Sequence, residues 1–293
     1  MRGPRPADAG VRLLHISDIH FGRSYVEAHV AAAEALAAET AASETPFDAI
    51  IVSGDLSQRA RAPEFLAARG LLGRLENVAP VLVVPGNHDA QWWRAPLGLG
   101  GAARVHAEWR RVIARELEPT LRLPGVSIVG LNSAGGVMPW TLTWNPRDLR
   151  VKGGLTNEQL VDAAARIDAT PDGDLRVLVL HHNVVRGKLS NRWGLARPEV
   201  ALARIGAMGV DVVCTGHDHE ERAEVVSTRS GPLLVSTANT LSNRARGKRV
   251  ASLNIIEASK AEVAVRVWHF DSEQGSFAMQ HETVVARERR FAS

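Results

Sequence analysis

The 293-residue sequence contains one cysteine, Cys214, so it cannot form an internal disulfide, and it fits a reducing compartment. No apolar run approaches the ~18 residues of a membrane-spanning helix. The first ten residues are polar and rich in Pro, Arg and Gly, and they lack the apolar segment of a signal peptide. We therefore expect a disordered lead at 1–10, a cytoplasmic location and no membrane partner.

The sequence also has little excess of either charge. It contains 35 Lys and Arg against 32 Asp and Glu, a net charge of +3, although the sequence pI is about 9.5. This excess is too small to establish a polyanionic partner, so nucleic acid is a possible ligand without being an implied one. A hydrophobic content of 45% in a chain of this length predicts a globular protein with a large core.

Apolar runs alternate with helical segments over the first 210 residues, which is typical of βαβ units. We expect strands at 11–16, 49–53, 81–84, 126–131, 175–180 and 210–214, and helices at 25–42, 63–76, 156–167 and 198–208. Four strands of alternating polarity should follow, at 223–227, 233–237, 249–257 and 262–270, in an antiparallel meander. We predict one α/β domain over 11–293.

Two segments interrupt this alternation. Residues 91–121 form a less regular insert, in which we expect a helix at 105–118 and tryptophans that serve local packing. Residues 134–154 form a long loop rich in Gly and Pro, and loops of this length are often functional. The sequence does not say whether either segment shapes a substrate site.

The strand at 81–84 leads directly into chemically useful side chains. Pro85 ends the strand because it has no N–H to donate, and Gly86 permits a sharp turn. Asn87, His88 and Asp89 then stand at the carboxyl end of the strand, where open α/β sheets place their ligands. Such a polar turn alone would be an ordinary surface loop.

The same design recurs at four further strand ends, which makes a metal centre the better interpretation. Residues i and i+2 of an extended chain point the same way, so Asp-x-His and His-x-His pairs can reach one centre. Imidazole, carboxylate and amide donors without thiolate suit Mn, Fe, Co or Zn. These side chains are too many for one tetrahedral site but suit two ions that share a carboxylate. The five strand ends supply Asp18, His20, Asp55, Asn87, His88, His181, His217 and His219.

Two such ions suit hydrolysis of a phosphate ester. They cancel the charge that repels a nucleophile, stabilise the attacking and leaving oxygens of an in-line displacement, and supply hydroxide by lowering the pKa of a bridging water. The motifs resemble those of the calcineurin-like metallophosphoesterases, in the same order along residues 18–219: Asp18-Ile19-His20, Gly54-Asp55, Gly86-Asn87-His88-Asp89, His181 and Gly216-His217-Asp218-His219.

The resemblance implies a role for each residue. Asp18, His20 and His219 would hold one metal, Asn87, His181 and His217 would hold the other, and Asp55 would bridge them. His88 would contact the phosphoryl group and protonate the leaving alkoxide, and Asp89 would orient His88. The implied fold is a four-layer α/β/β/α sandwich of two mixed sheets. His182 is expected to pack behind the ligands, and Asn183 stands where the family often has Pro.

The layout is similar to that of the bacterial cyclic-nucleotide phosphodiesterase-like (class III) branch. We therefore predict a phosphodiesterase rather than a phosphomonoesterase, with a cyclic nucleotide as one possible substrate. A nuclease or DNA-repair phosphoesterase is the alternative, with Arg-rich segments at 104–115 and 243–249 to hold phosphates. A non-catalytic scaffold is disfavoured because each ligand position is filled. Substrate, native metals and oligomeric state stay open.

Overall fold

A computed structural model describes residues 10–94, 104–136 and 152–287 of the chain. Almost all of the expected disordered lead and most of the long loop at 134–154 lie outside these residues. Among the described helices, none has the length and apolarity that crossing a membrane would require.

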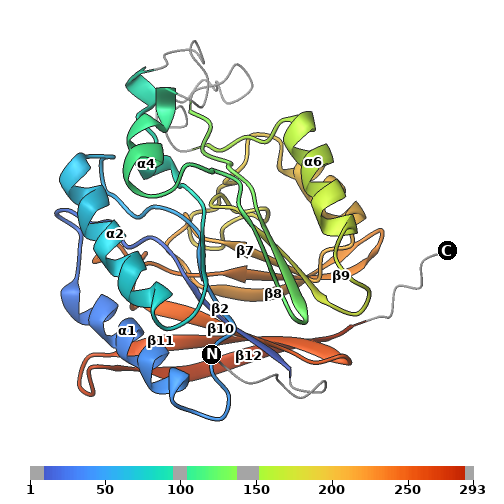
Figure 1. Cartoon of the computed structure of the whole chain (residues 1–293). Coiled ribbons are helices and arrows are strands. Elements are labelled where there is room, and N and C mark those ends of the chain that lie inside the picture. Colours follow the sequence, from blue (N-terminus) through green and yellow to red (C-terminus); the bar gives the residue numbers. More distant parts are fainter. Residues whose placement is uncertain (1–9, 95–103, 137–151, 288–293) are drawn as a thin grey trace.

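The predicted alternation of strands and helices is largely confirmed (Figure 1). The strands are β1 (Val11–Ile16), β2 (Ala49–Val52), β3 (Val81–Val83), β4 (Thr120–Leu123), β5 (Val126–Gly130), β6 (Leu175–Val179), β7 (Val212–Thr215), β8 (Arg222–Thr228), β9 (Gly231–Thr237), β10 (Ser252–Ala258), β11 (Glu262–Asp271) and β12 (Ser276–Ala286). The α-helices are α1 (Glu27–Ala41), α2 (Ala62–Glu76), α4 (Ala107–Val112), α6 (Asn157–Asp168) and α7 (Pro198–Ala207). The 3₁₀ turns are η1 (Asn87–Asp89) and η2 (Trp92–Arg94).

Local sequence signals explain several boundaries. The helix α6 begins with a capping box, in which the Thr156 hydroxyl accepts from Gln159 N (3.2 Å) and the Gln159 side-chain oxygen Oε1 accepts from Thr156 N (2.9 Å). Pro63 lies in the first turn of α2, where its missing N–H removes no helical hydrogen bond. The strands β2, β5 and β7 are buried throughout, as their continuous apolar runs predict.

Two mixed sheets of six strands form the centre of the protein. Their strand orders are β12-β11-β10-β1-β2-β3 and β4-β5-β6-β7-β9-β8. The strands β1, β2 and β3 are parallel to one another, as are β5, β6, β7 and β9, whereas the remaining pairings are antiparallel. Carboxyl ends of several neighbouring strands therefore meet at one edge of each sheet.

Helices cover the outer face of each sheet, which gives the four layers that the resemblance implied. One apolar cluster joins α1 and α2 to the first sheet, a second fills the space between the sheets, and a third joins the second sheet to α6 and α7. Figure 1 shows α1 and α2 outside the sheet of β10, β11 and β12, and α6 on the side of β7, β8 and β9.

The structure corrects the sequence prediction at three places. The strands β4 and β12 were missed, and the expected helix at 105–118 is the short helix α4. The predicted meander is wrong, because β8 and β9 join the second sheet while β10–β12 join the first. Alternating polarity indicates that one face of a strand is exposed to solvent, but it does not indicate which sheet the strand joins. Trp109 packs in the core against Phe65, as expected for the insert.

Candidate metal centre

Turns that follow β1, β2, β3, β6 and β7 bring the predicted donor side chains together. Asp18 and His20 follow β1, Asp55 follows β2, and Asn87 follows β3. His181 follows β6, while His217 and His219 follow β7. Both sheets contribute, and the donors lie where their carboxyl ends approach one another. The structure thus collects all seven predicted metal donors in one place.

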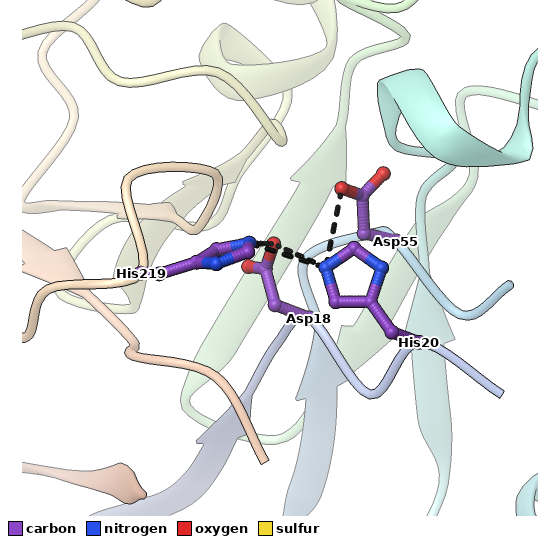
Figure 2. Close-up of side chains that lie close together, drawn as sticks. All are labelled: Asp18, His20, Asp55 and His219. Carbon is purple, nitrogen blue, oxygen red and sulfur yellow. Dashed lines mark hydrogen bonds and ion pairs between the residues drawn. The ribbon is translucent and has the colours of Figure 1, made fainter. Parts of the chain in front are cut away.

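The first donor cluster consists of Asp18, His20 and His219. His219 Nε2 lies 3.0 Å from Asp18 Oδ1 and 3.1 Å from His20 Nε2. His20 Nε2 also lies 3.6 Å from Asp18 Oδ1 and 3.8 Å from Asp55 Oδ2. Figure 2 shows the side chains of the cluster and Asp55 lying close together. One donor atom from each of these four residues lies within 4.8 Å of the others.

Asn87, His181 and His217 form a second donor cluster. Asn87 Oδ1 lies 2.9 Å from His217 Nδ1 and 3.1 Å from His181 Nε2. The two ring nitrogens are 3.3 Å apart. His181 Nε2 lies 3.4 Å from Asp55 Oδ2, the same oxygen that faces the first donor cluster. The Asp55 carboxylate therefore stands between the two clusters.

The backbone that presents these donors differs from the expected extended chain. Asp18, His20, Asp55, His217 and His219 all have positive φ, between 51° and 73°. Side chains at i and i+2 therefore converge through left-handed turns, and the extended-chain argument for their convergence is wrong. Non-glycine residues seldom adopt this conformation, and such strain concentrates at functional sites. Hydrogen bonds from Asp18 N to Gly54 O and from His20 N to Asp55 O, both 3.0 Å, hold the turns.

Two glycines, Gly86 and Gly216, let the turns pack directly against the Asp55 and Asp18 carboxylates. A Cβ on Gly86 would lie 2.1 Å from Asp55 Oδ1, and one on Gly216 would lie 2.0 Å from Ser17 Oγ and 2.4 Å from Asp18 Oδ2. The carboxylates thus rest directly against neighbouring backbone. Backbone N–H groups of His88 and His217 donate to Asp55 Oδ1 (2.8 Å) and Asp18 Oδ2 (2.9 Å). Each carboxylate keeps its other oxygen directed at the ring nitrogens.

Buried carboxylates and imidazoles shift one another's pKa values. Burial alone would raise the pKa of Asp18 and Asp55, but His219 and His181 respectively hold these values well below the usual range. Burial would lower the pKa of His181, yet the charge of Asp55 outweighs it and raises the value to about 9. Burial lowers the pKa of His217 to about 3. The site therefore favours ionised carboxylates and a positive charge on His181, within the second donor cluster.

The donor atoms are arranged to bind cations rather than to form hydrogen bonds with one another. His219 Nδ1 donates to Arg244 O (2.9 Å) and His181 Nδ1 donates to Ser53 O (2.8 Å), since a carbonyl only accepts. In neutral rings this leaves the Nε2 lone pairs pointing at the centre. Asp18 Oδ1 is buried and accepts no hydrogen bond from the described residues. Lone pairs that converge at such short distances suit cations, and nitrogen and oxygen donors suit Mn, Fe or Zn.

His88 and Asp89 sit beside the clusters but do not act as one unit. His88 Nδ1 donates to Gln58 O (2.7 Å), so Nε2 is the nitrogen that faces the cavity. The Asp89 carboxylate instead accepts from the backbone of Gly86, Leu56 and Ser57 and from the Ser57 hydroxyl. The prediction that Asp89 orients the His88 ring is therefore wrong. Asp89 ties the turn after β2 to the turn after β3.

Asp89 is also electrostatically unlike the two carboxylates among the donors. Burial, together with the nearby charge of Asp55, raises the pKa of Asp89 to about 7. Its hydrogen-bond donors come from two turns at once, and each of those turns carries donor side chains. Asp89 thus has a structural part in the centre.

His182 packs behind the donors as expected, and the structure also places Asn183, for which the sequence predicted no role. His182 is buried, its Nδ1 lies 2.8 Å from Ser133 Oγ, and its ring packs 4.5 Å from that of His217. Asn183, which stands where the family often has Pro, donates to the Asp218 carboxylate. It thereby joins the turn after β6 to the turn after β7.

A cavity of about 440 Å³ opens over the donors. The sequence prediction missed Lys152, Arg192 and Trp193, which help to line it, and it connected Arg244 only with a general basic segment. The adjacent Arg192 and Trp193 form a basic-aromatic pair that could have been recognised. The contact between Arg244 Nη1 and His88 Nε2, at 3.2 Å, joins residues 156 positions apart and leaves no mark in a local pattern.

This fold and these motifs agree with the comparisons to known proteins. The profile of the calcineurin-like phosphoesterase family matches residues 11–221, which is most of the chain. The chain therefore belongs to the calcineurin-like phosphoesterase family.

A curated relative is the glycerophosphodiester phosphodiesterase GpdQ of Enterobacter lignolyticus (strain SCF1), with 36% identity over 83 residues. That match covers 26% of this chain and 29% of the relative, so it spans less than a third of the relative's length.

Solved structures share the fold at 11% sequence identity. The yellow lupin (Lupinus luteus) purple acid phosphatase PPD1 superposes with a TM-score of 0.66 over 97% of this chain and 55% of its own. PhoD gives a TM-score of 0.64 over 98% and 72% of the two chains. GAP50 of Plasmodium gives 0.56 over 96% and 90%.

Proposed function

We propose that the protein is a phosphodiesterase with two metal ions. Asp18, His20 and His219 hold one ion, and Asn87, His181 and His217 hold the other. The observation that carries the proposal is the position of Asp55, whose Oδ2 faces His20 Nε2 at 3.8 Å and His181 Nε2 at 3.4 Å. One carboxylate oxygen between two sets of ring nitrogens suits a bridge.

The bound ions, of which Mn, Fe or Zn fit the donors, would cancel phosphoryl charge and activate water near neutral pH. The chain itself supplies the proton for the leaving group. His88 is half-buried, lines the cavity and directs Nε2 into it, because its Nδ1–H is engaged by Gln58 O. In the imidazolium form His88 carries a proton on both ring nitrogens, and Nδ1–H stays on Gln58 O. Once Arg244 Nη1 turns from Nε2 to the phosphoryl oxygens, the Nε2 proton can pass to the departing alkoxide, which is the general-acid step and leaves His88 neutral.

Two observations support a diester as the substrate. The matched relative is named a glycerophosphodiester phosphodiesterase. The cavity of about 440 Å³ also has room for groups on both sides of a phosphorus atom placed near the donors.

The test is hydrolysis of bis-p-nitrophenyl phosphate and of p-nitrophenyl phosphate by chelated protein, with and without added Mn²⁺. We expect cleavage of the diester that depends on the metal and exceeds cleavage of the monoester. Preference for the monoester would identify a phosphatase instead. Inactivity with every divalent metal would favour the scaffold alternative.

A further inference from the structure

The cavity over the donors is lined by more positive charge than a simple diester needs. Four cationic residues contribute to the lining: Lys152, Arg192, Arg244 and Arg246. Among the described residues two carboxylates line it, and both are engaged, since Asp55 faces the donor clusters and Asp218 accepts from Asn183. The open part of the cavity is therefore positively charged.

The three arginines are available to a ligand. None of them lies within 4.0 Å of a carboxylate oxygen in the part of the chain that the structure describes, although ion pairs hold many of the other arginines there. Arg244 Nη1 reaches His88 Nε2 at 3.2 Å, which places this guanidinium beside the proposed acid. Arg246 Nε donates to Asp218 O (2.8 Å), and Arg192 is exposed.

Buried acidic residues hold the two loops that carry these arginines. The Glu220 carboxylate accepts from Leu189 N (2.8 Å) in the loop of Arg192, and it pairs with Arg222. Glu221 pairs with Arg249 at the end of the loop that carries Arg244 and Arg246. Both acids follow directly after His219. The cationic loops are thus fixed to the donor turn itself.

We propose that the site is selective for phosphodiesters that carry a second phosphate next to the scissile one. This inference rests on the proposed function. Arg244 contacts the oxygens of the scissile phosphoryl group, and Arg192 and Arg246 contact the neighbouring phosphate. A simple diester has one negative charge, which two metal ions and Arg244 already offset, so two further guanidinium groups match a second anion.

Nucleotide chains are one source of this chemistry, and other diphosphorylated diesters are another. Trp193 is half-buried, lines the cavity next to Arg192 and offers an aromatic face on which a base can stack. The experiment separates the contribution of the phosphate from that of the base.

The test compares kcat/KM for three dinucleotides: thymidylyl-thymidine, the same molecule with a 5′-phosphate, and the 5′-phosphorylated form with abasic sugars. We expect the 5′-phosphate to raise kcat/KM about tenfold and the gain to shrink at high salt. If the abasic form keeps the gain, phosphate recognition alone accounts for it. If the abasic dinucleotide is not cleaved, while the 5′-phosphate still raises kcat/KM for the dinucleotide with bases, the substrate is a nucleotide.

The double variant Arg192→Gln/Arg246→Gln should reduce the tenfold preference for the 5′-phosphorylated dinucleotide to about twofold or less. If the double variant does not fold, the single variant Arg192→Gln replaces it in the test. Lys248→Gln is the matched control, because Lys248 is exposed in the same loop and does not line the cavity. It should keep the preference. Equal kcat/KM with and without the 5′-phosphate, while bis-p-nitrophenyl phosphate is cleaved, overturns this inference alone. Failure to cleave any diester overturns the proposed function as well.

Discussion

The two donor clusters each contain two imidazole side chains but differ in charge and exposure. The first has its own carboxylate, Asp18, whereas the second has an uncharged amide, Asn87, in the corresponding place. Asp18, His20 and His219 are all buried, while Asn87 and His217 are only half-buried at the cavity. If the clusters hold the two proposed ions, we expect the first, with its own carboxylate, to retain its ion more tightly than the second.

The backbone shows the same contrast. Every member of the first cluster has positive φ, whereas His217 alone does so in the second. Residues in this conformation persist only where the surrounding structure holds them. The first cluster is thus fixed by the turns after β1 and β7, and the second depends more on side-chain placement.

Asp55 joins the clusters, so its substitution should have the largest effect. Asp55→Asn removes the charge that both clusters face, and we expect turnover of bis-p-nitrophenyl phosphate to fall at least ~1,000-fold. Metal analysis after dialysis should show reduced occupancy at both positions. Two full equivalents of metal in this variant would contradict the bridging role.

His88→Ala separates metal retention from chemistry. The variant should keep both metals, because no His88 side-chain nitrogen lies among the donors, and it should lose roughly 10²–10⁴ in turnover of diesters with poor leaving groups. The loss should be much smaller with p-nitrophenol, which departs without a proton. Equal losses with both leaving groups would remove the acid role from His88.

Asn87→Asp tests the contrast in charge. The substitution gives the second cluster the carboxylate that the first already has, so we expect its metal dissociation constant to fall more than tenfold. Titration calorimetry with Mn²⁺ should then show two similar sites instead of two distinct ones. If the weaker site keeps its affinity, charge does not distinguish the clusters.

The smallest effect concerns His106, a buried residue of the insert between β3 and β4. Burial lowers the pKa of His106 to about 4, and its Nε2 lies 2.9 Å from Ala134 O. Because the folded-state pKa lies below the unfolded value of about 6.5, His106 favours the folded state fully above pH 6.5 and progressively less as the pH falls toward 4. We expect a loss on the order of 1 kcal/mol in unfolding free energy between pH 7 and 5.5.

His106→Gln can keep the hydrogen bond to Ala134 O without titrating, so urea unfolding of the chelated variant should depend less on pH. This variant distinguishes acid unfolding from acid release of metal at the clusters. The same pH dependence in both proteins would mean that other groups control acid stability.

The sequence predicted which residues meet, but not how the backbone brings them together. The motifs at Asp18, Asp55, Asn87, His181 and His217 follow apolar strands, and parallel strand ends meet at a sheet edge, so their convergence was predictable. The left-handed turns were not, because Asp and His carry no local signal for positive φ comparable to that of glycine.

Contacts across long sequence separations account for the remaining differences. Asp89 lies next to His88 in the sequence, yet its partners are backbone groups 32 and 33 residues away as well as Gly86. Arg244 reaches His88 from a loop after β9. Neither contact follows from spacing, because each depends on how one turn packs against another.

The close packing of Gly86 and Gly216 against the two carboxylates has a consequence for redesign of this protein. A single added methyl group at either glycine would displace the Asp55 or Asp18 carboxylate, so this part of the site tolerates almost no variation. Arg192 and Arg246 have exposed side chains, and their loops are held by Glu220 and Glu221. Both arginines can therefore be substituted without moving the two carboxylates. Libraries that seek new substrates should therefore sample the rim and leave the glycines untouched.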